Sequence, residues 1–201
     1  VATVQGQGER AFADIIERLL GGEPLHGIAG VTTTDETGAV QQTPARPAED
    51  VNRFPAADYG LIPVEAYFRA KGQRQLDYVS SQGCRFRCAF CADPTVYGRS
   101  WSGLAPERVG DELAYLARAY GVRDVAFQDE TFFTHAARVT RISEHLLTRA
   151  TTVTWMATMR ADQGARLPAD VFALCRRAGL RRVMVGLESG SQDMLDWMKK
   201  D

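Results

Sequence analysis

The chain has 201 residues, of which 45% are hydrophobic and 24% charged; this is close to the globular average, so one or two packed domains are expected and general disorder is excluded. Lys and Arg number 24 against 25 Asp and Glu, and the formal net charge of −1 gives no indication of nucleic acid or an anionic membrane as a partner. No apolar stretch approaches the roughly 20 residues of a membrane-spanning helix, and the first residues lack the basic start and apolar run of a signal peptide.

The first 31 residues predict a strand, a helix and a second strand. VATV, residues 1–4, is a short β-branched run, and LHGIAGV, residues 25–31, is predicted as a strand that its two glycines weaken. Between them, apolar residues recur at helical spacing: Phe12, Ile15, Ile16, Leu19 and Leu20. Residues 32–70 begin with a polar, aperiodic stretch and hold four of the eight prolines, so an extended linker with turns is predicted.

From residue 71 onward, strands and helices alternate. Strands are predicted at residues 76–81, 122–128, 152–159 and 181–187. Helices follow each of them: Pro106 and Pro168 open two, Gly121 and Gly179 end these two, Val139 to Leu147 mark another, and Met194 begins the last. Strands that alternate with helical crossovers predict an α/β fold with a parallel sheet, here about four β/α units, which is half of an eight-fold barrel.

Polar residues follow all four of these strands. The first strand leads into Gln82-Gly83-Cys84, and the second into Asp129-Glu130. Arg160 follows the third strand, and Glu188-Ser189 follows the fourth. Each group alone is compatible with a solvated loop or a helix cap, such as Ser191 before the last helix. Since parallel strands present their carboxyl ends on one rim, the four groups together predict a site there.

Three cysteines, Cys84, Cys88 and Cys91, form a C-x-x-x-C-x-x-C motif within this rim. Three thiolates in eight residues suit a compact centre of a soft metal. A closed zinc site normally has a fourth protein ligand, and Cys175 lies on the apolar face of a predicted helix, where a buried inert thiol is expected. The motif therefore fits a [4Fe–4S] cluster with one iron open to an exogenous ligand, while a zinc-stabilised module and a disulfide remain the alternatives.

The motif CRFRCAFC, with the aromatic Phe90 before its third cysteine and a strand before its first, resembles that of the radical S-adenosylmethionine (radical SAM) superfamily. The resemblance implies a partial barrel over residues 71–201, in which Cys84, Cys88 and Cys91 bind three irons of a [4Fe–4S] cluster. It also implies that the fourth iron chelates S-adenosylmethionine, which one electron cleaves to a 5′-deoxyadenosyl radical. Phe90 would then pack near the adenine.

The same resemblance assigns roles to other strand ends. Asp129 and Glu130 occupy the place of a Gly-Gly-Glu segment that contacts the methionyl amino group; FQDETFF departs from this pattern but resembles the variant of cobalamin-dependent members. Arg160 would neutralise a carboxylate, the alternative being an ion pair with Asp162. Glu188 and Ser189, in VGLESGS, resemble the segment that contacts the ribose or the amino-acid moiety.

The N-terminal segment has a formal G-x-G-x-x-A pattern in GQGERA. A dinucleotide fingerprint would need an acidic residue at the end of the next strand, and a tight strand-to-helix turn is the plainer interpretation. The whole segment, with the later FPAADYGLIPVEAY, resembles the end of the Rossmann-like cobalamin-binding domain that precedes the barrel in one radical SAM class. Residues 1–31 would be its remnant, with Gly6, Gly8 and Glu9 bordering the cofactor.

Together these resemblances imply a cobalamin-dependent radical SAM methyltransferase or cyclase of which this chain is a part. The alternatives are a radical SAM enzyme without cobalamin and a zinc- or cluster-stabilised structural module that is not an enzyme. The implied cofactors are a [4Fe–4S] cluster, S-adenosylmethionine and cobalamin. The implied partners are a small-molecule or peptide substrate and an electron donor such as flavodoxin or ferredoxin, and an oxygen-sensitive cluster implies the reducing cytoplasm.

Overall fold

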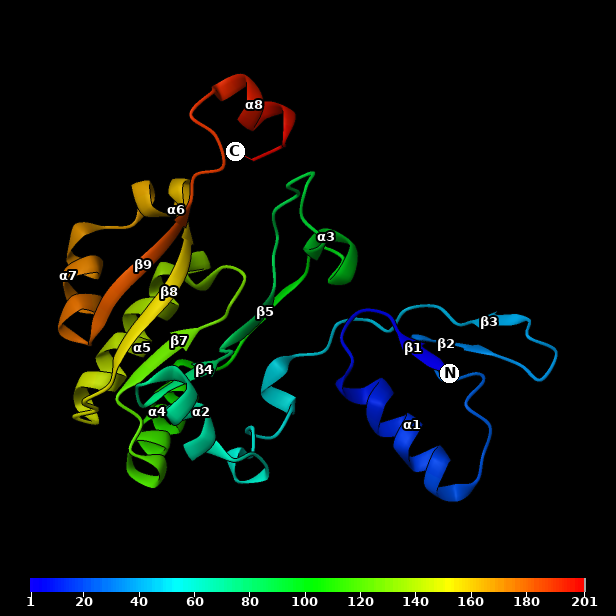
Figure 1. Ribbon diagram of the computed structural model, residues 1–201. Helices are drawn as coiled ribbons and strands as arrows, with labels where there is room; N and C mark the ends of the chain where they lie inside the picture. The colour runs from blue at the N-terminus through cyan, green and yellow to red at the C-terminus, as the bar shows by residue number, and fades with distance from the viewer. Residues whose placement is uncertain (201) are drawn as a thin grey trace.

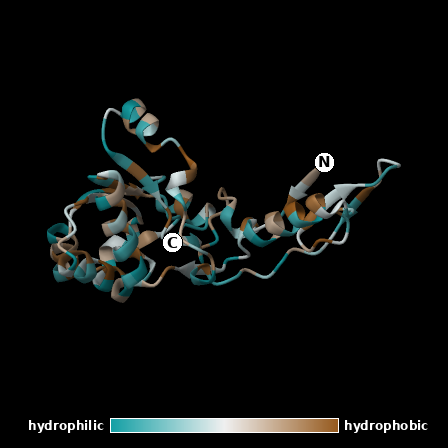
Figure 2. Cartoon of the chain, turned by 90° about the horizontal axis from the view of Figure 1, so that it is seen from below, coloured by the Kyte–Doolittle hydropathy of each residue, from teal (hydrophilic) through white to brown (hydrophobic). Residues whose placement is uncertain are grey.

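The computed structural model describes residues 1–200 and arranges them in two units joined by an extended stretch (Figure 1). Viewed from below, the chain is elongated, with the N-terminal unit at one end (Figure 2). The antiparallel strands of this unit, in spatial order, are β1 (Ala2–Val4), β2 (Val31–Thr34) and β3 (Val40–Gln42). Helix α1 (Glu9–Gly21) buries Ala11 and Ile15 in a small core with Ile28 and Val31.

Two predictions for the first 70 residues differ from the structure. Residues 25–31 do not form a strand, since Gly27 and Gly30 have φ of +81° and +75° and β2 begins only at Val31. The predicted linker contains the β2–β3 hairpin, whose turn is held by the Asp35 carboxylate through the amides of Thr37 and Ala39 at 2.9 and 3.0 Å. A turn held by polar hydrogen bonds needs no apolar residues at regular spacing. The sequence therefore has no periodic pattern that would predict this hairpin. Short helices complete this stretch: η1 (Val51–Arg53), η2 (Tyr59–Leu61) and α2 (Val64–Lys71).

The second unit is built on a parallel sheet in which the strands follow the spatial order β4-β7-β8-β9. Its strands are β4 (Gln75–Tyr78), β7 (Asp124–Phe127), β8 (Thr154–Arg160) and β9 (Leu180–Gly186). Its main helices are α4 (Pro106–Tyr120), α5 (Ala136–Thr148), α7 (Ala169–Arg177) and α8 (Gln192–Trp197). Helix α5 packs between α4 and α7 over one face of the sheet (Figure 1). The predicted α/β fold with four β/α units is confirmed.

The strand predicted at residues 76–81 is split in two. Strand β4 ends at Tyr78, and β5 (Ser81–Gly83) pairs antiparallel with β6 (Trp101–Gly103). The separation has a physical cause, because the Ser80 amide donates to the carboxylate of Asp129 at 2.7 Å instead of to a strand. Short helices lie in the connections: α3 (Asp93–Val96), η3 (Phe132–Thr134) and α6 (Ala161–Arg166).

Aromatic side chains form the centre of the core between the sheet and its helices. Trp155 on β8 is fully buried, and its ring centroid lies 5.6 Å from that of Phe127 and 5.3 Å from that of Phe132. The indole N–H donates to the Ala178 carbonyl at 2.9 Å, so its polar atom is satisfied. Burial of each such side chain stabilises the fold by about 1.5–3 kcal/mol, and it fixes β8 so that Arg160 emerges at the carboxyl rim.

The opposite rim of the sheet is held by Asp124 at the start of β7. Its carboxylate accepts hydrogen bonds from Gln75 on β4, from Thr154 on β8 and from the guanidinium of Arg181 on β9. Burial alone would raise the pKa of Asp124, but the hydrogen bonds from Arg181, Thr154 and Gln75 outweigh it and hold the pKa below the usual 3.8. One carboxylate therefore ties all four strands.

We expect Asp124→Ala to lower the free energy of unfolding by about 2–4 kcal/mol, because it leaves Arg181 without its partner and breaks the tie between strands. Asp111→Ala, which removes an exposed partner of His145 and Arg149, should change it by less than about 1 kcal/mol. Urea unfolding measures both. Folding lowers the pKa of Asp124, so its ionised carboxylate stabilises the wild-type protein fully above pH 3.8. This stabilisation is lost as the pH falls through the lowered pKa of the folded state. A difference between wild type and Asp124→Ala that persists at lower pH would contradict the assignment.

Candidate metal centre

The three motif cysteines lie on an irregular loop between β5 and α3. Cys84, Cys88 and Cys91 are all partly exposed and none is in a disulfide. The Cys91 amide donates to the Cys88 carbonyl at 3.1 Å, which closes a turn and brings these two residues together. Burial raises the pKa of the Cys84 and Cys91 thiols, so binding of a metal would have to displace their protons.

Gly83 fixes the direction in which this loop leaves β5. Its φ is +85°, and a Cβ at this position would lie 2.4 Å from the Ser100 carbonyl oxygen. Its amide donates to Glu130 at 3.2 Å. The residue before the first cysteine must therefore be glycine, because a side chain would push β5 away from the Ser100 backbone.

A cavity of about 370 Å³ collects the three thiols and the ends of three parallel strands. Three of the strand ends predicted to share a rim do lie together, since Glu130 after β7, Arg160 on β8 and Glu188 after β9 all line this cavity. The remaining residues of its wall are Phe90, Asp93, Thr131, Thr158, Met159, Met184, Val185, Gly186 and Lys200. Side chains far apart in the chain thus face one space beside the cysteines.

Arg160 is a buried cation in the wall of this cavity. Its guanidinium lies 3.6 Å from the centroid of the Phe86 ring, and its Nη1 donates to the Cys88 Sγ at 3.3 Å. Nε also donates to the Asp162 carboxylate at 2.8 Å, so the ion pair with Asp162, the alternative role of Arg160, is present as well. Stacking and hydrogen bonds hold Arg160 in one geometry, which suits recognition of a carboxylate.

Glu188 and Phe90 line the mouth of the cavity. Glu188 has a left-handed φ of +61°, and its carboxylate accepts from the Lys200 ammonium at 2.8 Å. Lys200 also lies 5.8 Å from the Phe90 ring, which is 55% exposed. The Ala89 amide donates to the Met198 carbonyl at 2.8 Å, and this bond places the segment after α8 against the cysteine loop.

The structure does not bring the other predicted residues into the cavity. Ser189 accepts from the Ser191 amide at 3.1 Å and lies beside the cavity. Asp129, predicted to contact a cofactor, is 1% exposed, and its oxygens accept from the Ser80 amide and from the hydroxyls of Ser80 and Ser81 at 2.6–2.7 Å. Asp129 therefore does not reach the cavity, contrary to the predicted direct contact, and its carboxylate instead fixes Ser80 and Ser81.

Gly6, Gly8 and Glu9 lie at the contact between the two units. The Glu9 carboxylate accepts from the Gln82 side chain at 2.8 Å, and Gln82 in turn accepts from Gln7 at 2.8 Å. Gly6 approaches the Val96 carbonyl so closely that a Cβ would lie 3.3 Å from it. These residues adjoin β5 and α3 instead of the thiols, and their predicted contact with a cofactor stays a prediction.

Two side chains that shape the site are not part of the sequence prediction: Lys200, which lines the cavity, and Phe86, which lies against Arg160 without lining the cavity itself. Lys200 belongs to no motif. Phe86 could have been found, because it alternates with Cys84 and Cys88 as a residue on the same face of an extended chain does. Cys175 is fully buried on α7 with its Sγ 3.5 Å from the Ser143 hydroxyl, away from the cavity, as predicted.

The donor set fits an iron–sulfur cluster. Within residues 1–200, no three His, Cys, Asp or Glu side chains converge as the ligands of a single ion would. The thiolates of a [4Fe–4S] cluster each bind a different iron, so they need only face a shared cavity, as Cys84, Cys88 and Cys91 do. The three thiols would supply the ligands of the cluster, and Arg160 would supply a positive charge next to them.

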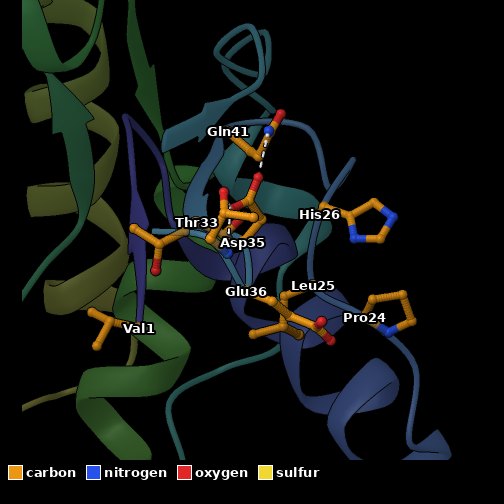
Figure 3. A pocket seen from close by; sticks show the side chains of 10 residues that line it. Val1, Pro24, Leu25, His26, Thr33, Asp35, Glu36 and Gln41 are labelled. Carbon is orange, nitrogen blue, oxygen red and sulfur yellow. Dashed lines mark hydrogen bonds between the residues drawn. The ribbon is translucent and has the colours of Figure 1, made fainter. Parts of the chain in front are cut away.

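A larger cavity, of about 710 Å³, lies on the N-terminal unit and carries no comparable chemistry (Figure 3). Asp35 is its best-placed carboxylate, but hydrogen bonds from Thr37, Gln41 and Ala39 hold the pKa of Asp35 at about 2 and engage it in the hairpin. His26 is exposed beside Leu25 and Pro24 and points away from Asp35 (Figure 3). The cysteine loop is therefore the stronger candidate for the functional site.

Residues 78–201 match the Radical SAM superfamily. Over 200 residues the chain is 32% identical to an uncharacterised methyltransferase of Pyrococcus horikoshii, covering 99% of this chain and 42% of the relative. It is 25% identical to an anaerobic magnesium-protoporphyrin IX monomethyl ester cyclase of Synechocystis, covering 98% of this chain and 39% of the relative. The cobalamin-dependent S-adenosylmethionine radical enzyme OxsB, solved with aqua-cobalamin and S-adenosylmethionine, superposes with a TM-score of 0.77 at 24% identity over 99% of this chain and 29% of that one. The chain thus spans less than half the length of these relatives, and the last likeness confirms the fold.

We expect Cys84→Ala, Cys88→Ala and Cys91→Ala each to lose most bound iron, because two thiolates cannot hold three irons of a cluster. Cys175→Ala is the matched control and should bind iron as the wild type does, since this thiol lies in the core. Iron per chain after anaerobic reconstitution measures all four variants, with circular dichroism to verify folding. Wild-type iron content in any motif variant, or loss of iron in folded Cys175→Ala, would contradict the ligand assignment.

Proposed function

The chain belongs to the radical SAM superfamily, and from this membership we propose that it holds the cluster-binding half of a cobalamin-dependent radical SAM enzyme, a methyltransferase or a cyclase. The observation that carries the proposal is the cavity that joins three unpaired thiols to the polar ends of three parallel strands. When bound there, a [4Fe–4S] cluster supplies the electron for reductive cleavage of S-adenosylmethionine to a 5′-deoxyadenosyl radical. The protein's task is to bind and orient the cluster and S-adenosylmethionine and to enclose them.

The residues predicted from the sequence have the following roles in this proposal. Cys84, Cys88 and Cys91 bind the cluster. Arg160 orients the carboxylate of S-adenosylmethionine, since its guanidinium is fixed against Phe86 and Asp162. Glu188, with Ser189 beside it, receives the amino or ribose groups.

Two further residues complete the cavity in this proposal. Phe90, exposed at the mouth, offers an aromatic face to the adenine. Glu130 is half-buried at the cavity wall beside Thr131, where burial raises its pKa, and it supports the loop by accepting from the Gly83 amide.

The cobalamin dependence rests on the relatives and on the N-terminal unit. The solved structure of OxsB holds aqua-cobalamin and S-adenosylmethionine, and its fold covers nearly the whole of this chain. In this proposal the N-terminal unit, residues 1–31 with the β2–β3 hairpin, ends a cobalamin-binding domain, the rest of residues 32–70 is the linker and residues 71–201 are the radical SAM core. Gly6, Gly8 and Glu9 adjoin the cobalamin side of the junction. Such an enzyme takes electrons from a flavodoxin or ferredoxin in the reducing cytoplasm.

No helix within residues 1–200 has the length and apolar character needed to cross a membrane.

The substrate is a small molecule or a peptide that reaches the cavity from the open face of the sheet. Exposed Met184 on β9 lies on this side of the cavity wall.

Electron paramagnetic resonance of the anaerobically reconstituted, dithionite-reduced chain tests the proposal, with and without S-adenosylmethionine. We expect a reduced [4Fe–4S] signal that changes when S-adenosylmethionine is added, because one iron accepts the added ligand. About one zinc per chain and no iron would instead indicate a structural zinc module. The cobalamin claim is tested by asking whether a longer form of the protein retains a corrinoid. Consistent absence of the corrinoid would overturn the claim.

We expect Glu188→Gln to weaken binding of S-adenosylmethionine about ten-fold while the cluster stays intact, because the variant loses the charge that attracts an ammonium group but keeps its shape. Isothermal titration of the reconstituted chain measures the affinity, and iron content verifies the cluster. The control is Glu144→Gln, an exposed carboxylate on α5 with no role in the cavity. Equal affinities for wild type and Glu188→Gln would remove Glu188 from the binding site.

A further inference from the structure

The guanidinium of Arg160 contacts a motif thiol on one side and a carboxylate on the other. Its Nη1 donates to the Cys88 Sγ at 3.3 Å, so a cation lies at hydrogen-bond distance from one of the three sulfurs. Its Nε donates to the Asp162 carboxylate at 2.8 Å. Sulfur, guanidinium and carboxylate therefore form a row, which we call the Cys88–Arg160–Asp162 row.

The fold holds this row in place from several directions. Arg160 ends β8, and Asp162 lies in the first turn of α6 directly after it. The Arg160 amide donates to the Gln163 side chain at 3.4 Å, which fixes the start of α6 against the end of the strand. The Phe86 ring lies 3.6 Å from the guanidinium and covers it. The contact between Arg160 and the sulfur is therefore built into the backbone geometry.

Both charges of the row are largely withdrawn from solvent. The side chains of Arg160 and Asp162 are 8% and 15% exposed. Arg166 also lies 3.8 Å from Asp162, but its side chain is 80% exposed and its charge is screened by water. Since buried charges are screened much less than exposed ones, Arg160 and Asp162 both act strongly on the neighbouring sulfur.

The other two motif thiols have a carboxylate as their charged neighbour. Burial and the charge of Asp93 raise the pKa of the Cys84 and Cys91 thiols. Cys88 instead receives a hydrogen bond from a cation. The three sulfurs thus differ in their electrostatic surroundings, and Cys88 is the one on which Arg160 acts directly.

Hydrogen bonds to the sulfur ligands and the charge around them set the reduction potential of an iron–sulfur cluster. Reduction by one electron adds a negative charge. A cation that donates to a ligand sulfur stabilises the reduced form and raises the potential, whereas a buried carboxylate nearby destabilises it and lowers the potential. The Cys88–Arg160–Asp162 row contains one group of each kind.

We propose that Arg160 and Asp162 set the reduction potential of the cluster in opposite directions, Arg160 raising it through Cys88 and Asp162 lowering it. The inference rests on the proposed function, because it requires a cluster at Cys84, Cys88 and Cys91. In the reaction concerned, an external one-electron reductant loses an electron and the oxidised cluster gains it. No covalent bond forms or breaks, and no proton moves. This role of Arg160 operates before S-adenosylmethionine binds, so it is separate from recognition of a carboxylate.

The test measures the midpoint potential of the cluster in Arg160→Gln, Arg160→Lys and Asp162→Asn. The matched control is Arg141→Gln, which removes an exposed arginine on α5 that pairs with Glu107 and does not line the cavity. Each anaerobically reconstituted chain is titrated with dithionite in the presence of redox mediators and without S-adenosylmethionine. Electron paramagnetic resonance follows the reduced cluster, and iron content and circular dichroism verify its assembly and the fold.

We expect Arg160→Gln to lower the equilibrium constant for reduction at least about ten-fold, which is about 59 mV for a one-electron couple. Asp162→Asn should raise this constant about three-fold, or about 28 mV, because Arg160 keeps its contact with Cys88 and loses the opposing charge. Arg160→Lys should fall between Arg160→Gln and wild type, since it keeps the charge without the fixed fork. The control should have the potential of wild type.

A wild-type potential in Arg160→Gln would overturn the inference. A shift of Arg160→Gln and Asp162→Asn in the same direction would also overturn it, because a rearranged loop and not the two charges would then set the potential. If Arg160→Gln assembles no cluster, Asp162→Asn decides, and an unchanged or lowered potential in this variant counts against the inference.

Failure of the proposed function would give a different result. A reducible cluster whose signal ignores S-adenosylmethionine would overturn the proposed function, yet opposite shifts in the two variants would still support the inference. Unchanged potentials in a cluster whose signal responds to S-adenosylmethionine would overturn the inference alone. A chain that binds zinc and no iron would overturn both.

Discussion

The geometry of the site depends on the hydrogen bonds that the buried carboxylate of Asp129 accepts. It accepts hydrogen bonds from the Ser80 amide at 2.7 Å and from the hydroxyls of Ser80 and Ser81 at 2.6 Å. Burial raises the pKa of Asp129 because it penalises the charge, and these donors offset part of that penalty. Since the Ser80 amide is engaged there, β4 cannot continue alongside β7, and the chain turns into β5 and the cysteine loop.

Strand β5 consequently connects three parts of the molecule. At its end, Gly83 donates to Glu130 in the cavity wall and leads directly into Cys84. In its middle, the Gln82 side chain bonds to Gln7 and Glu9 of the N-terminal unit at 2.8 Å. The N-terminal unit is therefore hydrogen-bonded to a residue that stands only two positions before the first thiol, Cys84.

The parts of this arrangement that depend on local signals could be predicted from the sequence. Pro106 and Gly121 bound α4 because each acts through its own backbone. The β5–β6 hairpin could not be predicted, since its strands have three residues each and are set by the distant contact of Ser80 with Asp129. For the same reason the sequence did not distinguish buried Asp129 from its neighbour Glu130 in the cavity. Both follow the same strand, and only their tertiary contacts separate them.

The two sets of cations around the thiols act over different ranges. Arg160 is buried and lies 3.3 Å from the Cys88 sulfur, so little solvent screens its charge and it acts on the site itself. The second set, Arg85 and Arg87 on the cysteine loop, is exposed, and at physiological salt the field of such charges fades within about 8 Å of the surface. The charge of Arg160 is therefore felt at the thiols more strongly than that of either exposed loop arginine, because it is both closer to a sulfur atom and less screened.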